Sequence, residues 1–418
     1  MPEINRRPVI IGYDAVSPMG VDLEGQWEAL ASGASGLGDL TRIDSSGDFP
    51  VKMAGQAPDL PRDEYDFLGP RHSAQWTSPI FRYGMYVVQR ALDGAGLVID
   101  DSLGQRVATT LSTAIGGLDA VIAADRDMIS RGRLPAPMVN PNSCVNMIAG
   151  KASMLTGATG PIATTVSACA TGSTSMITGA MFLASGMADV AICGAVDFPL
   201  IPPIVAGFAT MNGAYKFRRT GENLPPEEAS RPFSRGRRGF VIAEGAGCVL
   251  LATREFARAH GLSHDIELAG WATTSDAHHF VMPRLETVQR CMEQAVEHAG
   301  ISPGDVACVN AHAASTRVGD EIEARALANV FGDDPPPVTA NKSQFGHAMG
   351  ASSALESIWA MHGMQKDTLL PTLNYDPDPD IAPVRVCTET TGMVQEYVLK
   401  NAFGFGGCNA CLVFRRTG

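Results

Sequence analysis

The sequence has no apolar run long enough to span a membrane. The nearest candidate extends from residue 168 to 188, which carries no charge but is rich in glycine, serine and threonine. A membrane helix needs about 20 predominantly apolar residues. We therefore expect a helix buried on every side of a large protein, and no membrane partner. The first 20 residues also lack the apolar core of a targeting segment, and we expect them to begin the first strand.

Positive charge is scarce. The chain has 32 Lys and Arg against 44 Asp and Glu, which gives a formal net charge of −12. Nucleic acids and anionic membranes are themselves negative, so this balance argues against a broad surface for either of them. An acidic partner would need a local basic patch.

The cysteines do not form the even set of a disulfide framework. There are nine, mostly within apolar runs, which suits buried thiols in a reducing compartment and predicts a cytoplasmic protein. The CNAC segment at 408–411 lacks a second ligand pair, and we interpret it as part of a buried strand. Asp276, His278 and His279 in SDAHH are interpreted as polar residues near a functional site, and no metal is expected.

Short β-rich runs alternate with helical patterns along the 418 residues, of which 45% are apolar. This alternation predicts an α/β protein with mainly parallel sheets covered by helices on both faces. The β-rich runs are RPVIIGYDA, RVATTLSTA, IATTVSA, ADVAICGAV, GCVLLAT, DIELAGWAT, DVACVNAHA, PVTANKS and NACLVFRR.

Two segments share one design and indicate an internal duplication. Residues 164–197 and 337–363 each pass from a β-like stretch through small residues into an apolar helix. We expect the boundary near residues 254–265, where a charged helix gives way to a new strand. The charges and prolines of residues 215–238 predict a surface loop, whose arginines are a candidate docking feature.

Cys169 lies where the strand-like VSACA meets the predicted helix. Backbone N–H groups and the dipole at a helix start favour an anion, so a thiol there would ionise more readily and could act as a nucleophile. A buried structural cysteine is the alternative. The helix is indicated by apolar residues at helical spacing, namely Met176, Ile177, Ala180, Met181 and Ala184.

Three further features follow Cys169 along the chain. His312 and His347 each follow a β-like segment at a turn where side chains can converge, and Lys342 lies five residues before His347. FGFGG at 403–407 is a flexible, aromatic-flanked loop. Taken singly, the histidines are compatible with core residues, the lysine with a surface residue and FGFGG with an ordinary turn. Their joint order along the chain is more specific.

With these motifs the sequence resembles the β-ketoacyl-acyl carrier protein synthases of the I/II type, which are thiolase-fold condensing enzymes. The likeness covers nearly the whole chain. It rests on VSACATGS, GMADVAICGAVD, EEASRPFSRGRRGFVIAEGAG, TTSDAHH, VNAHAASTRVGDEIEA, NKSQFGHAMGASSALES and NAFGFGG. The resemblance implies a five-layered αβαβα fold from two similar halves. We expect residues 1–258 to carry Cys169 and residues 259–418 to carry both histidines, Lys342 and the FGFGG loop.

The resemblance also implies the chemistry. An acyl chain would be transferred to Cys169 and extended by two carbons in a decarboxylative Claisen condensation with a malonyl unit. Both substrates are thioesters on the phosphopantetheine of an acyl carrier protein, and no cofactor of the enzyme's own is implied. His312 and His347 match the pair that stabilises the enolate, while Lys342 and Glu356 match a supporting charged pair.

Other matching positions concern substrate binding. Phe405 corresponds to the aromatic residue of a gating loop, and its N–H, with that of Cys169, would receive the acyl oxygen. We expect the acyl pocket to involve residues 112–117 and Phe208. The remaining positions matched to substrate binding are Ile115, Thr316, Phe403, Gly404 and Gly406. The family is usually a homodimer, and a heterodimer with a related subunit is the alternative.

Two segments depart from the family pattern. Residues 312–316 read HAAST where HGTST is common, so Ala314 lacks a hydroxyl that helps hold pantetheine and Thr316 keeps the second one. Residues 70–84 are poor in the basic residues that dock the carrier protein. Arg71 and Arg82 remain there, and docking through Lys216, Arg218 and Arg219 is the alternative.

Three other readings are compatible with parts of the pattern. A thiolase uses a second cysteine in a Cys-x-Gly loop, whereas Cys408 follows FGFGG outside such a motif. Ketoacyl synthase III has asparagine where this chain has His347. A non-catalytic chain-length partner of a type II polyketide synthase usually lacks the nucleophile, which Cys169 supplies here. Fatty-acid and polyketide roles both fit the motifs.

Overall fold

Strands from the two halves of the chain meet in one sheet. The structure, a computed structural model, describes residues 7–60, 75–218 and 223–418. Within these ranges nine strands follow the order β4-β5-β6-β1-β7-β13-β12-β8-β9. Their bounds are β1 (Pro8–Val16), β4 (Val107–Thr109), β5 (Val190–Asp197), β6 (Gly245–Thr253), β7 (Ile266–Ser275), β8 (Cys308–Asn310), β9 (Val338–Thr339), β12 (Tyr397–Gly404) and β13 (Cys408–Arg416). Two small pairs are β2 (Leu37–Asp39) with β3 (Met53–Gly55), and β10 (Thr368–Leu369) with β11 (Thr391–Gly392).

The two halves repeat one pairing scheme. In the first half β4 is parallel to β5, β5 is antiparallel to β6, and β6 is antiparallel to β1. In the second half β8 is parallel to β12, β12 is antiparallel to β13, and β13 is antiparallel to β7. The halves join where Val9 of β1 pairs with Glu267 of β7. This repetition agrees with the expected duplication.

The expectation of mainly parallel sheets was wrong. Most pairs of the large sheet are antiparallel, and parallel pairing is confined to its two outer regions. The short turn at 405–407 joins β12 to β13 and forces them to run in opposite directions. The repeated scheme gives the same direction change between β5 and β6. Because β5 and β6 are buried along their whole length, the sequence shows no alternation that would reveal this.

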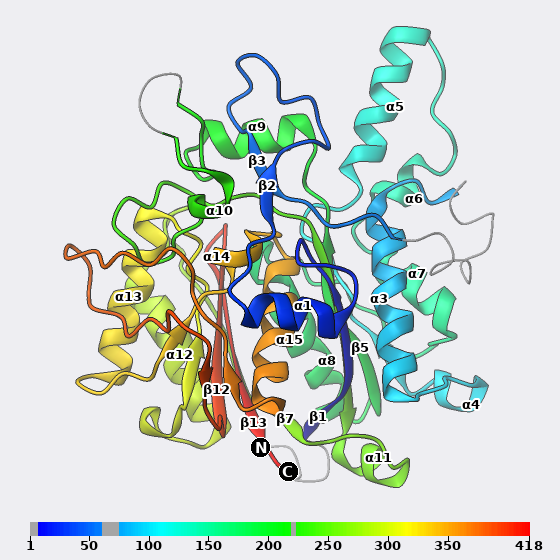
Figure 1. Cartoon of the computed structure of the whole chain (residues 1–418). Helices are drawn as coiled ribbons and strands as arrows, with labels where there is room; N and C mark the ends of the chain where they lie inside the picture. Colours follow the sequence, from blue (N-terminus) through cyan, green and yellow to red (C-terminus); the bar gives the residue numbers. More distant parts are fainter. Residues whose placement is uncertain (1–6, 61–74, 219–222) are drawn as a thin grey trace.

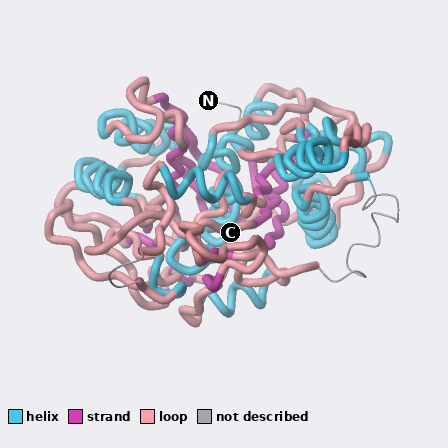
Figure 2. The backbone as a smooth tube through the Cα atoms, turned by 90° about the horizontal axis from the view of Figure 1, so that it is seen from above, coloured by secondary structure: helices cyan, strands magenta, loops and turns pink. Residues whose placement is uncertain are grey.

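Helices form three layers around the strands. In Figure 1, α8 and α15 lie between the strands of the two halves, α12 and α13 cover the second half, and α3 and α7 cover the first. Figure 2 shows helices in the middle and on both sides of the strands. The fold therefore has the five layers α, β, α, β, α. The helices are α1 (Leu23–Ala31), α3 (Pro79–Ala95), α4 (Asp101–Gly104), α5 (Leu118–Arg131), α6 (Val139–Ser143), α7 (Met147–Thr156), α8 (Thr171–Ala184), α9 (Pro202–Thr210), α10 (Pro226–Ala229), α11 (Arg254–Ala259), α12 (Leu285–Ala299), α13 (Arg317–Phe331), α14 (Lys342–Phe345) and α15 (Ala351–Gln365).

The two central helices pack closely because their contact is built from small residues. A Cβ on Gly172 of α8 would lie 2.5 Å from the backbone nitrogen of Ala354 on α15, so a larger residue does not fit there. In α15 every residue from 351 to 364 is buried. The helix expected around residues 168–188 is confirmed, but complete burial was wrong at its end, where Met181 is 58% exposed. Within the described ranges, no helix combines the length and apolar character needed to cross a membrane.

Candidate active site

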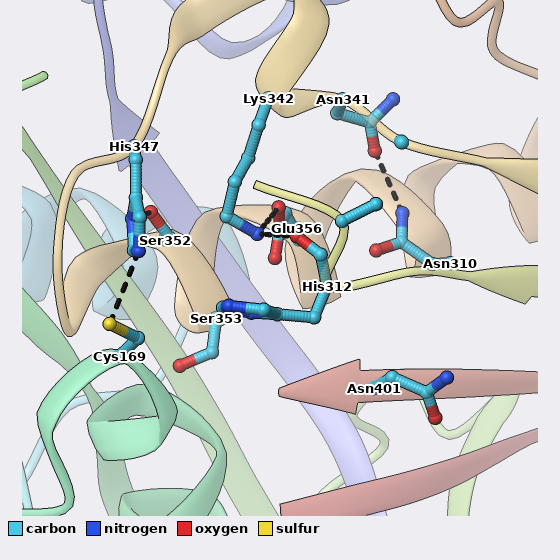
Figure 3. Close-up of polar contacts among 12 residues, drawn as sticks. Cys169, Asn310, His312, Asn341, Lys342, His347, Ser352, Ser353, Glu356 and Asn401 are labelled. Atoms are coloured by element: carbon cyan, nitrogen blue, oxygen red, sulfur yellow. Dashed lines mark hydrogen bonds and ion pairs between the residues drawn. The ribbon is translucent and has the colours of Figure 1, made fainter. Parts of the chain in front are cut away.

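The residues singled out from the sequence converge on one cavity of about 790 Å³. Cys169 comes from the short turn before α8, His312 from the loop after β8, His347 from the loop between α14 and α15, and Phe405 from the turn after β12. Thr316, Phe403 and Gly404 also line this cavity. Figure 3 shows Cys169 below His347, with His312, Lys342 and Glu356 beside them.

A strained turn presents the thiol of Cys169. The residue lies in a short 3₁₀ turn, Ala168–Ala170, directly before α8, and Ala168 has a positive φ of 49° that L-residues rarely adopt. Gly404 passes so close that a Cβ there would lie 2.3 Å from the carbonyl oxygen of Ser167. Glycine at 404 therefore lets the loop after β12 approach the nucleophile.

The prediction that the helix start favours a thiolate was wrong. Burial raises the pKa of Cys169 to about 11, against the charge of Lys342 and the backbone N–H groups of Phe405 and Cys169, which lower it. The side chain is only 7% exposed, and loss of hydration outweighs the helix-end field. At neutral pH the resting thiol keeps its proton and needs a base.

His347 is placed to be that base. Its Nε2 lies 3.1 Å from the Sγ of Cys169, and its Nδ1 lies 2.9 Å from the hydroxyl oxygen of Ser352, as Figure 3 shows. Burial and the charges of Lys342 and Lys400 hold the pKa of His347 well below its ordinary value. The imidazole is therefore neutral and can accept the thiol proton at Nε2.

His312 faces His347 across the same cavity. The two ring centroids lie 5.6 Å apart at 82°, and Phe403 packs 5.7 Å from the His312 ring. The pKa of His312 also lies well below its ordinary value, chiefly because of burial and secondly because of the charge of Lys342. Two neutral imidazoles therefore face one space, where their N–H groups can stabilise negative charge on a bound oxygen.

Lys342 and Glu356 form the charged pair expected from the sequence. Their Nζ and Oε1 atoms lie 2.5 Å apart, and both side chains are almost completely buried. Lys342 also donates to the backbone oxygen of His312 at 2.5 Å, which fixes the loop that carries this histidine. The pair supports the site from behind without lining the cavity.

Several supporting residues were not identified from the sequence. Glu323 on α13 accepts the backbone N–H groups of His312 and Ala313, at 2.9 and 2.7 Å, and a side-chain N–H of Asn401 at 3.0 Å. Lys400, on β12, is fully buried beside Glu356. The only available signal was position, because Glu323 is the last residue but one of the VNAHAASTRVGDEIEA motif and Lys400 directly precedes NAFGFGG.

The predicted acyl-pocket residues lie in an apolar cluster next to the cavity. Three side chains pack against this cluster, namely Ile115, Phe208 and Phe405. The ring centroids of Phe208 and Phe405 lie 6.2 Å apart. Phe405 lines the cavity, whereas Ile115 and Phe208 do not. Gly406 is exposed at the turn, and its N–H donates to the oxygen of Phe280 at 2.8 Å.

The HAAST loop is fixed from both ends. Ala313 donates its N–H to Glu323, while Ala314 and Thr316 line the cavity. Arg237, which the sequence placed in a surface loop, is only 5% exposed and donates to the backbone oxygen of Thr316 at 3.1 Å. The surface-loop prediction is therefore wrong at Arg237, because this arginine satisfies buried carbonyl groups.

The cavity mouth is basic. Lys216, Arg218, Arg238 and Arg317 line it together with the exposed ring of Phe217. Of the other basic residues considered for docking, Arg82 is half-buried over the ring of Tyr83. Arg71 and Arg219 lie outside the described residues.

Two segments, CNAC and SDAHH, contain residue types that can bind metals, but their side chains lie in other environments. Cys411 is buried within β13, and Cys408 is half-buried at the start of the same strand. Asp276 lines the cavity and accepts a side-chain N–H of Asn409 at 2.6 Å, whereas His278 is exposed and His279 is half-buried. In the part of the chain that the structure describes, no cluster of three or more His, Cys, Asp or Glu side chains could hold a metal ion.

Curated relatives match the sequence over nearly the whole chain. The chain is 34% identical over 419 residues to 3-oxoacyl-[acyl-carrier-protein] synthase 2 of Staphylococcus aureus strain N315, covering 99% of each. It is 33% identical to the protein of the same name from Coxiella burnetii, again over 99% of each.

Solved structures show the same fold. A β-ketoacyl synthase from Burkholderia phymatum matches with a TM-score of 0.90, at 29% identity over the whole of both chains. A type II polyketide ketosynthase, solved with its acyl-carrier protein and a hexaketide, matches with a TM-score of 0.89, at 26% identity over the whole of both chains.

Two family descriptions account for most of the chain. The β-ketoacyl synthase N-terminal domain matches residues 5–257, and the β-ketoacyl synthase C-terminal domain matches residues 266–376. The matched regions include Cys169, His312, Lys342, His347 and Glu356. The chain therefore belongs to the β-ketoacyl synthase family.

Proposed function

We propose that this ketosynthase extends a carrier-bound acyl chain by two carbons in a decarboxylative Claisen condensation. The observation that carries the proposal is the hydrogen bond between the Cys169 thiol and His347, in one cavity with His312. A nucleophile with a neutral base supports acyl transfer, and two neutral imidazoles support an enolate. The curated relatives are named for the same reaction class.

The first half-reaction loads the enzyme. Cys169 gives its proton to Nε2 of His347, and the sulfur attacks the acyl thioester carbon. The backbone N–H groups of Cys169 and Phe405 stabilise the oxyanion, a role supported by their proximity to the Cys169 sulfur. The carbon–sulfur bond to pantetheine then breaks, and the departing sulfur takes up the proton.

The second half-reaction makes the new carbon–carbon bond. The thioester oxygen of the malonyl unit accepts N–H groups from His312 and from Nε2 of His347, which is protonated there in the tautomer whose Nδ1 accepts the Ser352 hydroxyl. The bond to the carboxylate breaks, carbon dioxide leaves, and its electron pair forms the enolate. The enolate carbon attacks the acyl carbon on Cys169, the carbon–sulfur bond breaks, and the departing thiolate takes up a proton from solvent to restore the resting thiol. Neutral imidazoles suit this step because an imidazolium could protonate and quench the carbanion.

We propose that an acyl carrier protein delivers both substrates at the basic mouth of the cavity. Lys216, Arg218 and Arg238 would contact an acidic carrier, and Thr316 would bind the pantetheine arm inside. No further cofactor is needed for this chemistry. A structural neighbour is described as a ketosynthase in complex with its acyl-carrier protein, which supports the same type of partner.

We also propose a homodimer. Large apolar side chains are exposed on α7, on α8 and on the segment that precedes Cys169, and a partner would cover them. Ile162, on that segment, bridges to Thr109 of the edge strand β4, so the face continues the sheet. The exposed residues are Met154, Ile162, Val166 and Met181. Sedimentation at micromolar concentration tests this proposal, and a stable monomer would contradict it.

The division of the chain and its compartment belong to the same proposal. We place the boundary between the halves at residues 258 and 259, within α11, just before β7 starts the second set of strands. We place the protein in the cytoplasm, which is supported by the nine free cysteines.

A chain-length-determining partner subunit is the alternative from another class. The retained thiol and its hydrogen bond to His347 favour the enzyme. Intact mass spectrometry with a panel of acyl carriers and malonyl carrier separates the two. The enzyme should become acylated on Cys169 and release a product two carbons longer, whereas a partner subunit would do neither. The panel also shows which chain lengths, and which pathway, the enzyme serves.

A further inference from the structure

A second lysine shares the carboxylate that supports the catalytic loop. Lys400 on β12 is completely buried, and its Nζ lies 2.8 Å from Oε2 of Glu356. Lys342 takes the other oxygen, Oε1. Lys400 also donates to the backbone oxygen of its neighbour Asn401. One carboxylate is therefore held between two buried ammonium groups from different elements.

The charges of this cluster balance only when Lys400 is included. Counted by formal charge, Glu356 and Glu323 contribute two negative charges and Lys342 and Lys400 two positive ones, and all four side chains are buried. Glu323 is held by three N–H donors, from His312, Ala313 and Asn401, so hydrogen bonds satisfy its oxygens but leave its charge uncancelled. An unbalanced buried charge is costly. Without Lys400 the cluster would carry a net charge of −1 directly behind His312.

This excess charge would act on the decarboxylation step. The enolate is negative, and Lys342, which donates to the backbone oxygen of His312, joins the cluster to the loop that binds it. We propose that Lys400 is a positioning residue for decarboxylation: it neutralises Glu356 and Glu323, so that Lys342 holds the His312 loop and both imidazoles stay neutral donors. This inference rests on the proposed condensation and adds a residue to it.

The first half-reaction depends much less on Lys400. The thiol of Cys169 is bonded to His347, and the charge that lowers its pKa is that of Lys342. The charge of Lys400 instead acts on both histidines and lowers the pKa of each. The ionisable groups that act on or contact the two imidazoles are Cys169, Lys342 and Lys400, and Glu323 and Glu356 lie behind the His312 loop. Loss of Lys400 should therefore separate the two half-reactions.

The test compares Lys400→Met, which removes the charge, with Lys400→Arg, which keeps it. Lys366→Met is a matched control, because Lys366 pairs with Glu24 at the exposed end of α15. For each full-length variant, self-acylation is followed by intact mass, and decarboxylation by carbon dioxide release from malonyl carrier across a pH series. Lys400→Gln, which keeps a polar N–H donor without the charge, serves if Lys400→Met does not fold.

Lys400→Met should lower kcat for decarboxylation by about tenfold or more, and its acid limb should move to higher pH by about one unit, as expected for a lost nearby charge. At neutral pH, where His347 stays neutral, self-acylation should change by less than about threefold, because the charge that acts on the thiol of Cys169 is that of Lys342. Lys400→Arg should recover most of the decarboxylation, and Lys366→Met should match the unmodified protein.

Equal losses in both half-reactions, or unchanged decarboxylation and pH profile in a folded Lys400→Met or Lys400→Gln protein, would overturn the role of Lys400. An unmodified protein that neither acylates Cys169 nor decarboxylates malonyl carrier would instead overturn the proposed function. The two failures are therefore distinguished by the unmodified protein alone.

Discussion

His312 and His347 should affect the two half-reactions differently, although both face the malonyl site. Only His347 is hydrogen-bonded to the nucleophile, at 3.1 Å from Sγ. The ring of His312 lies 5.6 Å from that of His347 and packs against Phe403. His312→Ala should therefore impair condensation and largely spare acylation, whereas His347→Ala should impair both.

The expected size follows from the bonds that are lost. Each imidazole supplies one donor to the enolate oxygen, and removal of one such donor costs about 10²–10³ in rate. His347→Ala also removes the base that takes the Cys169 proton, a contribution of about 10²–10⁴. It leaves the Ser352 hydroxyl without its imidazole partner, so about 1–3 kcal/mol of stability should be lost as well.

Two rates, self-acylation and condensation, measured on each folded variant test these expectations. Self-acylation is followed by intact mass after rapid mixing with an acyl carrier, and condensation by release of the β-ketoacyl product. His312→Ala should keep acylation within about tenfold while condensation falls at least about a hundredfold. Blocked acylation with intact condensation in either variant would refute the assigned roles. Thermal unfolding of both variants provides the control for folding.

Other outcomes follow from the same site. Cys169→Ala should abolish self-acylation, and mass spectra that show acylation at the unmodified rate would contradict this. Cys169→Gln, a neutral mimic of the acylated state, should still release carbon dioxide from malonyl carrier; a folded but inactive variant would argue against separable steps. Because burial raises the pKa of Cys169 to about 11, alkylation by iodoacetamide should increase from pH 7 to 9 without a plateau; a plateau below pH 8 would show an ionised thiol. Ala313→Gly with Ala314→Thr should restore a pantetheine hydrogen bond of about 0.5–1.5 kcal/mol and lower KM several-fold with little change in kcat; unchanged steady-state KM would show that this loop does not limit donor binding.

The reacting side chains could be identified from the sequence because short motifs carry them. Cys169, His312 and His347 each lie in a motif whose residue order is specific, and the structure brings all three to one cavity. Residues that act through tertiary contacts left no comparable signal. Lys400 lies in β12, a strand that none of the β-rich runs covered. Buried polar side chains interrupt the apolar pattern of this strand.

The electrostatic environment of the site, which sets the pKa of Cys169, was the least predictable property. A helix start lowers the pKa of a thiol, and the local sequence around Cys169 shows only that effect. Burial of the thiol, next to which Gly404 passes from more than 200 positions further along the chain, has the opposite effect and raises the pKa of Cys169 to about 11. Strand direction was misjudged for a similar reason, since strands buried on both faces look alike in either orientation.

The central claim is that one thiol accepts the acyl chain and two neutral imidazoles then direct its extension. The most direct measurement is intact mass spectrometry of the protein during a single turnover with acyl carrier followed by malonyl carrier. An acyl adduct should form on Cys169, and it should disappear as a carrier-bound β-ketoacyl product two carbons longer accumulates. An adduct on any other residue, or one that persists while malonyl carrier is decarboxylated, would contradict the account.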